Sequence, residues 1–206
     1  MSSHSAFDTR TVIIGASAAG LATAACLKRV GVECIVLEQS NQVGARWRSH
    51  YDRLHLHTNR GLSGLPFKPM PANYPRYPSR DQVVAYLEDY AKAFEISPRF
   101  GQKVVAVEQD GAGWITRTED ASCRSQYVVV ASGYANHAYM PTFPNMEQFK
   151  GNILHSREYK TGATYKGQSV LVVGFGNSGG EIAIDLYEQG AKPAMAVRNP
   201  VNVIPR

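Results

Sequence analysis

The chain has 206 residues, of which 44% are hydrophobic and 19% charged, and its formal net charge is +5. This length suggests one domain, or one domain plus part of another, and the composition excludes a disordered chain, a coiled coil and a collagen-like repeat. A pI of about 9.1 would fit a nucleic-acid-binding protein. Because the lysines and arginines are dispersed rather than gathered in basic runs, we give nucleic acid little weight as a partner.

The cysteine spacing and the apolar runs narrow the class of protein further. Cys26, Cys34 and Cys123 stand far apart with no Cys-x-x-Cys, which argues against a disulfide scaffold, a zinc site and a dithiol redox centre. Residues 1–8 contain no apolar core of a signal peptide, and the longest uncharged run, 11–27, is too short for a membrane span. We therefore expect a soluble, cytoplasmic protein with no membrane partner and no metal.

The first expected elements form a β-α-β unit. Residues 11–14 predict a buried strand, 18–30 a helix that ends at a glycine, and 34–37 a second apolar strand. Residues 41–80 follow without a sustained period, but they are rich in aromatic side chains. We expect them to form an ordered loop that covers something.

The middle of the chain predicts one helix and three strands. The helix runs over 80–94, the strands over 103–108 and 113–118 pair around a glycine turn, and residues 126–131 form another buried strand. Residues 134–168 then read as an irregular connector.

The last part of the chain repeats the opening pattern. A strand is expected over 169–173, a helix over 178–189 and a strand over 193–197, after which the chain stops at residue 206. The sequence therefore predicts an α/β fold with two Rossmann-like dinucleotide-binding units, of which the second is incomplete.

A glycine-containing turn, Gly15-Ala-Ser-Ala-Ala-Gly20, lies between the first strand and the first helix. Gly15 allows a tight turn, the small Ser17 lets a pyrophosphate approach, and Gly20 lets helix and strand pack closely. The helix N-terminus would hold the anion, and Glu38 is placed to accept hydrogen bonds from a ribose. The alternative is a glycine turn without a ligand. The residues expected to hold the first dinucleotide are Gly15, Ser17, Ala18, Ala19, Gly20 and Glu38.

The second turn, Gly174-Phe-Gly-Asn-Ser-Gly179, has all three glycines of the pattern, including Gly176. Arg198 stands at the end of the following strand, where the first unit has Glu38. An arginine can pair with a ribose phosphate, which favours NADP over NAD, although a solvated surface charge is the alternative. Two dinucleotide sites imply electron transfer between a nicotinamide and a flavin, so we assign the first site to FAD and the second to NADPH.

Three further segments carry a resemblance to a known family. Residues 44–47 are Gly-Ala-Arg-Trp, residues 51–59 are Tyr-Asp-Arg-Leu-His-Leu-His-Thr-Asn, and residues 149–159 match Phe-x-Gly-x-x-x-His-x-x-x-Tyr. With these motifs the sequence resembles flavin-dependent monooxygenases of the flavin-containing and indole-pyruvate type. Ala45 departs from the family's second glycine. The resemblance implies further cofactor-binding roles for Arg46, Trp47, Thr58, Asn59, Asn177 and Ser178.

The resemblance implies an NADPH- and FAD-dependent monooxygenase that inserts one oxygen of O₂ into a small organic substrate through a flavin peroxide. The substrate would be a nitrogen or sulfur heteroatom or an indole-pyruvate-type acid. Asn59 would be catalytic, holding NADP and the peroxide, and its alternative role is an Asx-turn. His155 and Tyr159 are expected to orient the connector. We interpret His50, His55 and His57 as flavin-loop or surface residues rather than metal ligands.

The resemblance also implies that the chain ends well before its relatives do. We expect an FAD-binding domain over 1–160 and the start of an NADP-binding domain over 161–206, with the oligomeric state open. Two alternatives remain at this point. One is an inactive FAD-binding remnant. The other is a pyridine-nucleotide disulfide reductase, which would need a reactive cysteine pair that this sequence does not offer.

Overall fold

The computed structural model describes residues 8–133, 137–200 and 202. It divides into two compact units, the first built from residues 1–48 and 56–136 and the second from residues 49–55 and 137–206. The signal-peptide prediction concerns residues that lie largely outside the described ones, as does the chain end at Arg206. The domain boundary expected at residue 160 stays a prediction about cofactor domains, and it does not coincide with the division into compact units.

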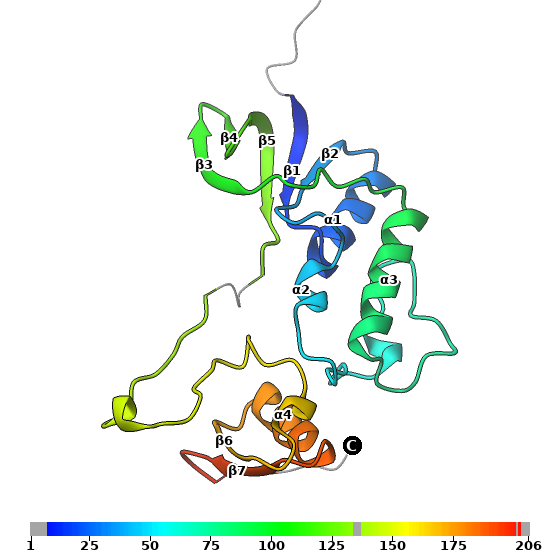
Figure 1. The fold of residues 1–206 in the computed structure, drawn as a ribbon. Helices are drawn as coiled ribbons and strands as arrows, with labels where there is room; N and C mark the ends of the chain where they lie inside the picture. The colour runs from blue at the N-terminus through cyan, green and yellow to red at the C-terminus, as the bar shows by residue number, and fades with distance from the viewer. Residues whose placement is uncertain (1–7, 134–136, 201, 203–206) are drawn as a thin grey trace, which may run out of the picture. The chain divides into compact units, whose positions relative to one another are not determined.

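A five-stranded sheet organises the first unit (Figure 1). Its strands lie in the order β2 (Cys34–Leu37), β1 (Thr9–Ile14), β5 (Ser122–Val130), β4 (Gly113–Thr118) and β3 (Val104–Asp110). β1 pairs in parallel with β2 and β5, whereas β3, β4 and β5 form an antiparallel meander. β5 thus joins the two halves of the sheet.

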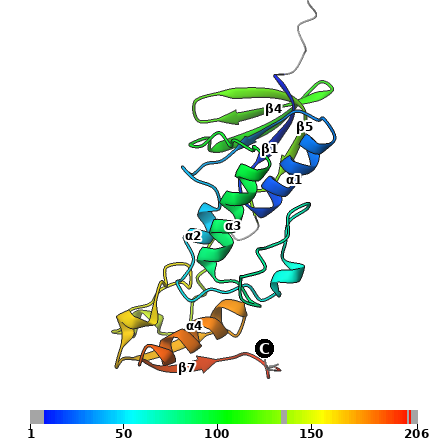
Figure 2. The same ribbon diagram turned by 90° about the vertical axis from the view of Figure 1, so that its right-hand side faces the viewer.

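The helices of the first unit are α1 (Ala18–Arg29), the short α2 (Ala45–Arg48) and α3 (Arg80–Ala93). α1 and α3 lie side by side (Figures 1 and 2). Their buried side chains share one apolar core with those of β1 and β2. A capping box of Ser79 and Gln82 starts α3, so the helix begins where its side chains can satisfy its first free N–H groups. This core supports the carboxyl end of β1, where the glycine turn begins.

The long loop before α3 is ordered by the helix that follows it. The Tyr86 hydroxyl accepts the Leu65 N–H at 2.7 Å and donates to the Lys68 carbonyl at 2.5 Å. The Tyr90 hydroxyl donates to the Pro66 carbonyl at 2.9 Å. The expectation of an ordered loop over 41–80 is therefore confirmed, and the structure adds α2 and a 3₁₀ helix, η1 (Arg60–Leu62), within it.

The second unit contains a two-stranded parallel sheet, β6 (Ser169–Val173) and β7 (Lys192–Ala196), connected by α4 (Asn177–Glu188). Two 3₁₀ helices precede them, η2 (Met146–Gln148) and η3 (Gly162–Tyr165). Its core is a small separate cluster whose fully buried members are Tyr51, Tyr159, Ile182, Leu186 and Ala191.

The expected elements agree with the structure in kind and order. The strands over 34–37, 113–118 and 169–173 have the predicted bounds, and the other predicted helices and strands differ by one to four residues at their ends. The largest difference is β5, which begins at Ser122 rather than at residue 126 because its first half pairs with β4 before its second half pairs with β1. The change of pairing partner along β5 cannot be recognised in the local apolar pattern of the sequence.

Because of Tyr90, the first unit should lose stability as the pH becomes alkaline. Burial raises the pKa of Tyr90 to about 12, because a phenolate would lose its hydration. A folded-state pKa above the unfolded value of about 10 means that the neutral phenol's contribution is fully present below pH 10 and is lost as the pH rises toward 12. Tyr90→Phe should lower stability by about 0.5–1.5 kcal/mol at pH 8 and flatten the decline above pH 10.

Urea unfolding at pH 8, 10 and 11 measures this effect. The control is Tyr127→Phe, because Tyr127 is half exposed. If the Tyr90 variant loses stability above pH 10 as steeply as the unmodified chain, Tyr90 does not contribute to the alkaline transition.

Candidate functional site

The first glycine turn follows β1 directly and only glycine fits its first position. Gly15 has φ +109°, its N–H donates to the Leu37 carbonyl at 2.8 Å, and a Cβ there would lie 2.6 Å from the Ala131 carbonyl oxygen. A Cβ at Gly20 would overlap the Gly15 carbonyl oxygen. These two positions bring α1 and the strand as close together as the sequence predicted.

The peptide groups of Ala16 connect this turn to two other segments. The Ala16 N–H donates to Glu38 Oε2 at 2.8 Å, and the Ala16 carbonyl accepts the Gly44 N–H at 3.1 Å. The other oxygen of Glu38 accepts the Ser40 N–H at 2.9 Å. Because a carboxylate offers about four acceptor positions, Glu38 keeps capacity for further donors such as ribose hydroxyls.

The N-terminus of α1 has the form of an anion site. Ser17 is the N-cap residue with extended backbone (φ −120°, ψ −164°), and within the described residues its side chain makes no capping hydrogen bond. The N–H groups of the first helical turn, which contains Ala18, Ala19 and Gly20, therefore receive no side-chain cap from Ser17. Together with the helix dipole, such N–H groups favour a phosphate.

The second turn repeats this geometry at the end of β6. Gly174 has φ +103° and its N–H donates to the Ala196 carbonyl at 2.9 Å. A Cβ at Gly179 would overlap the Gly174 carbonyl oxygen, as at the equivalent Gly20. Gly176 caps α4, which begins with Asn177 and Ser178, and a Cβ at Gly176 would meet no atom of the described residues within 4 Å. The second turn thus leaves open space where a pyrophosphate would approach.

The register of the strands places Arg198 one residue beyond its expected position. Ile14 pairs with Leu37 in the first unit and Val173 pairs with Ala196 in the second. The equivalent of Glu38 is therefore Val197, and the exposed Arg198 follows it. The expectation that Arg198 takes the place of Glu38 is corrected by this one-residue offset, which strand pairing decides and local sequence does not.

The remaining predicted residues of the first unit lie on α2 and before η1. Trp47 is half-buried against the core, and its N–H donates to the Gly44 carbonyl at 2.9 Å, beside Arg46 on the same short helix. Asn59 caps η1, because its Oδ1 accepts the Leu62 N–H at 3.2 Å. Asn59 therefore has the Asx-type local role that the sequence left open as an alternative. The Thr58 hydroxyl lies 2.7 Å from the Ser63 hydroxyl.

The predicted residues fall into two groups. Hydrogen bonds bring the first glycine turn, Glu38 and the segment that begins at Gly44 together, and Thr58 and Asn59 belong to the same compact unit. The second turn and Arg198 belong to the other unit.

Sequence reasoning missed an acidic stripe on α4. Glu181, Asp185 and Glu188 are spaced i, i+4 and i+7, so they share one face of the helix, and the first two are buried. Asp185 accepts the Tyr159 hydroxyl at 2.6 Å and the Gly162 N–H at 2.8 Å. Burial and the bond to Asp185 raise the pKa of Tyr159, which fits an orienting role rather than proton transfer. The sequence signal for this stripe was the helical spacing of its carboxylates along an otherwise apolar helix.

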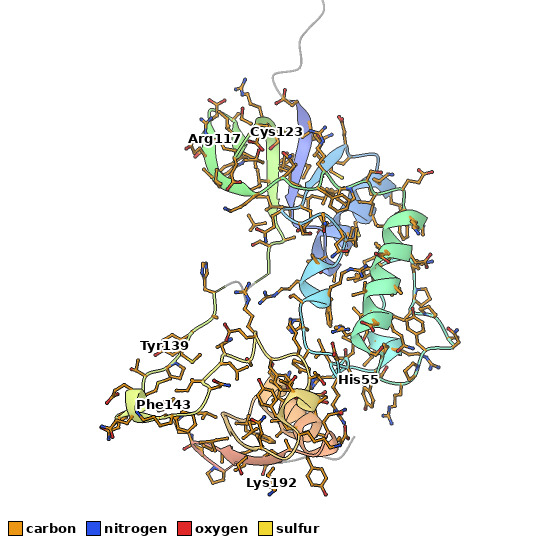
Figure 3. The ribbon with its side chains drawn as sticks, in the orientation of Figure 1. His55, Arg117, Cys123, Tyr139, Phe143 and Lys192 are labelled. Carbon is orange, nitrogen blue, oxygen red and sulfur yellow. The ribbon has the colours of Figure 1, made fainter. Side chains whose placement is uncertain are left out.

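Among the described residues, the cysteines and histidines form neither a disulfide nor a cluster that could hold a metal ion. All three cysteines are free, and burial raises the pKa of Cys34 and of Cys123, which lies on β5 (Figure 3). In the part of the chain that the structure describes, no three His, Cys, Asp or Glu side chains are grouped as a metal site would need. No helix in that part is long and apolar enough to cross a membrane.

Comparison with known proteins identifies the family. The profile of the pyridine nucleotide-disulphide oxidoreductase family matches residues 12–203. The chain belongs to this family. It is 46% identical over 199 residues to the indole-3-pyruvate monooxygenase YUCCA1 of Oryza sativa subsp. japonica, and this match covers 95% of the chain and 49% of the relative. It is 42% identical over 207 residues to the probable indole-3-pyruvate monooxygenase YUCCA3 of Arabidopsis thaliana, with 95% and 47% covered.

A solved structure supports the fold. The flavin-containing monooxygenase from Stenotrophomonas maltophilia superimposes with a TM-score of 0.86 at 30% identity, covering 93% of this chain and 58% of that one. The resemblance to flavin monooxygenases and the α/β, Rossmann-like fold class are thereby confirmed. The chain spans about half the length of the curated relatives it matches.

The glycines of the second turn make a matched pair for a stability test. Gly179→Ala should destabilise the second unit by about 1–3 kcal/mol, because its Cβ overlaps the Gly174 carbonyl. Gly176→Ala should change stability by less than about 1 kcal/mol, because its φ of −94° suits alanine and its Cβ enters open space. Urea unfolding followed by circular dichroism compares the two, and equal losses would show that the space at Gly176 is not open.

Proposed function

We propose that the first glycine turn binds FAD, that the second binds NADPH, and that together they serve an NADPH-dependent flavin monooxygenase. The observation that carries this proposal is the repetition of one turn geometry in both units, each time between a parallel strand and a helix N-terminus. A chain with two such turns can place a nicotinamide dinucleotide and a flavin dinucleotide in one protein.

The first turn offers FAD two kinds of contact. The N–H groups at the start of α1 would hold the pyrophosphate, and the free acceptor capacity of Glu38 would take the ribose hydroxyls. Glu38 is already fixed by the N–H groups of Ala16 and Ser40, so it needs little further ordering to bind. Bound FAD would supply the ring that takes a hydride from NADPH and reacts with O₂.

The second turn offers NADPH open space and a cation. The absence of side chains near a Cβ at Gly176 leaves room for phosphates at the start of α4. Arg198 follows the equivalent of Glu38 by one residue and is exposed, so its guanidinium is free of the desolvation that a buried cation would suffer. A ribose phosphate would pair with it through charged hydrogen bonds.

Oxygen transfer further requires that water be kept from the flavin. Thr58 and Asn59 belong to the ordered loop of the first unit, and the Asn59 amide nitrogen has no hydrogen-bond partner among the described residues. Its Oδ1 holds η1 in place while the NH₂ group remains available as a donor. We propose that this donor holds the nicotinamide dinucleotide against the flavin.

The substrate is proposed from the relatives. Identity of 46% to an indole-3-pyruvate monooxygenase supports an indole-pyruvate-type 2-oxo acid over a nitrogen or sulfur heteroatom. Disulfide reduction is the less favoured reaction, because it needs a thiolate and burial raises the pKa of both Cys34 and Cys123.

The flavin content of the purified chain and its use of NADPH test the proposal. We expect a yellow protein that takes up about one FAD per chain and oxidises NADPH with O₂, faster when indole-3-pyruvate is present. Colourless protein that does not bind added FAD would overturn the FAD assignment. FAD binding without NADPH oxidation would favour the alternative of an inactive FAD-binding remnant.

Arg198 should set the preference for NADPH over NADH. Arg198→Ala should weaken NADPH binding by about 1.5–3 kcal/mol, because a charged hydrogen bond to the ribose phosphate is lost. NADH lacks that phosphate and should bind as before. Titration of both nucleotides measures the difference, and equal weakening of the two would assign Arg198 no role in selectivity.

Asn59 can be tested with two variants that separate its two roles. Asn59→Asp keeps an oxygen for the Leu62 N–H but removes the NH₂ donor, whereas Asn59→Ala removes both. If the donor matters, both variants should still reduce the flavin but release more hydrogen peroxide per NADPH consumed. If only the cap of η1 matters, Asn59→Asp should behave like the unmodified protein.

A further inference from the structure

Arg53, which lies far from α4 in the sequence, pairs with two carboxylates of its acidic stripe. Its Nε and Nη2 donate to the two carboxylate oxygens of Glu188 at 2.7 and 2.9 Å, and its Nη1 donates to Glu181 at 3.2 Å. Glu181 is only 6% exposed. These hydrogen bonds raise the pKa of Arg53 and lower that of Glu188, as expected for a strongly paired fork.

The two carboxylates that Arg53 holds lie about two turns apart on the helix. Glu181 and Glu188 are seven residues apart, which is about 10 Å along a helix axis. A single planar guanidinium that holds both carboxylates fixes the rotation and the axial position of α4 at once. A lysine could not do the same, because its ammonium is a point charge without a fork.

The segment that carries Arg53, Ser49–His55, is built into the second unit over its whole length. The Asp52 N–H donates to the Lys160 carbonyl at 2.9 Å, and Lys160 Nζ donates to the Ser49 carbonyl. Tyr51 is buried, with its ring centroid 6.2 Å from that of Tyr159. Arg53 therefore acts from a fixed support rather than from a loose loop.

Both ends of this segment continue into residues of the first unit. Trp47 stands two residues before it, and Thr58 and Asn59 follow three and four residues after it. These flanking residues are the ones proposed to line the flavin, whereas the N-terminus of α4 is proposed to hold NADPH. Ser49–His55 is thus joined through the chain to residues of the first candidate site, and through the hydrogen bonds of Arg53 to α4.

We propose that Arg53 is a positioning residue that couples the two sites, so that binding of NADP⁺ at the start of α4 tightens binding of FAD. The coupling rests on the proposed function, since it requires that both dinucleotides bind. Bound NADP⁺ would hold the start of α4, Arg53 would transmit that position to Ser49–His55, and the flanking residues proposed to line the flavin would be ordered in turn. By linkage, FAD tightens NADP⁺ binding by the same factor.

The test is the Kd of FAD for the full chain, measured with and without saturating NADP⁺. The unmodified chain should bind FAD at least about fivefold more tightly when NADP⁺ is present, at the lower end of usual coupling factors. In Arg53→Met the factor should fall to about one, while the Kd of each ligand alone changes little. Arg53→Lys should restore part of the factor, because one carboxylate can still be paired.

Two further variants distinguish a loss of coupling from a merely structural effect. Lys192→Met removes an exposed cation from β7 of the same unit and should leave the factor unchanged (Figure 3). Glu188→Gln keeps the side-chain shape and should lower the factor, and the double variant with Arg53→Met should show the same factor as Arg53→Met alone, as residues acting through one contact require.

The outcomes separate the coupling from the proposed function. A factor of one in an unmodified chain that binds both ligands, or a factor that survives in Arg53→Met, overturns the coupling and leaves the function standing. An unmodified chain that binds neither ligand overturns both. If Arg53→Met fails to fold, the Glu188→Gln variant decides, and an unchanged factor there overturns the proposal.

Discussion

The peptide groups on either side of Ala16 are the point on which the first site depends. The N–H of this residue is held by a carboxylate and its carbonyl by the Gly44 N–H, so the turn, the end of β2 and the start of α2 are fixed to one another through a single residue. The hydrogen bond to Glu38 is charged and worth about 1.5–3 kcal/mol, about twice a neutral one. Glu38 therefore organises the turn before any ribose reaches it, and pre-ordering of this kind reduces the entropy cost of binding a dinucleotide.

The second turn has the same backbone conformation, but no carboxylate stands at the position equivalent to Glu38. Val197 stands at the position equivalent to Glu38 and offers no acceptor to the turn, while Gly176 replaces the small side chain of Ser17. The position of α4 is supported instead from its acidic face, through Arg53 and through the Asp185 contacts to Tyr159 and Gly162. One turn is thus fixed at its own loop and the other through the helix behind it, which makes the second more dependent on distant residues.

Local rules account for most of the fold and for the core of both sites. The two glycine turns follow from steric needs that the residue types alone reveal, and the bounds of β2 and β6 follow from short apolar runs with clear stops. What could not be predicted depends on long-range pairing. The early start of β5, the offset of Arg198 and the pairing of Arg53 with Glu188, 135 residues away, are each decided by which segments meet in space.

Long-range pairing also explains why the two domains suggested by the motifs differ from the two compact units of the structure. The glycine turns suggest two consecutive domains, because each motif is read along the sequence. The structure gives Ser49–His55 to the second unit although first-unit residues lie on both sides of it, so the backbone passes between the units three times. Glu181 is buried on α4 and needs a cation to offset its desolvation, and that cation is Arg53, from the loop that follows the first glycine turn in the sequence. The ion pairs of α4 therefore depend on Ser49–His55 belonging to the second unit, although first-unit residues precede and follow this segment in the sequence.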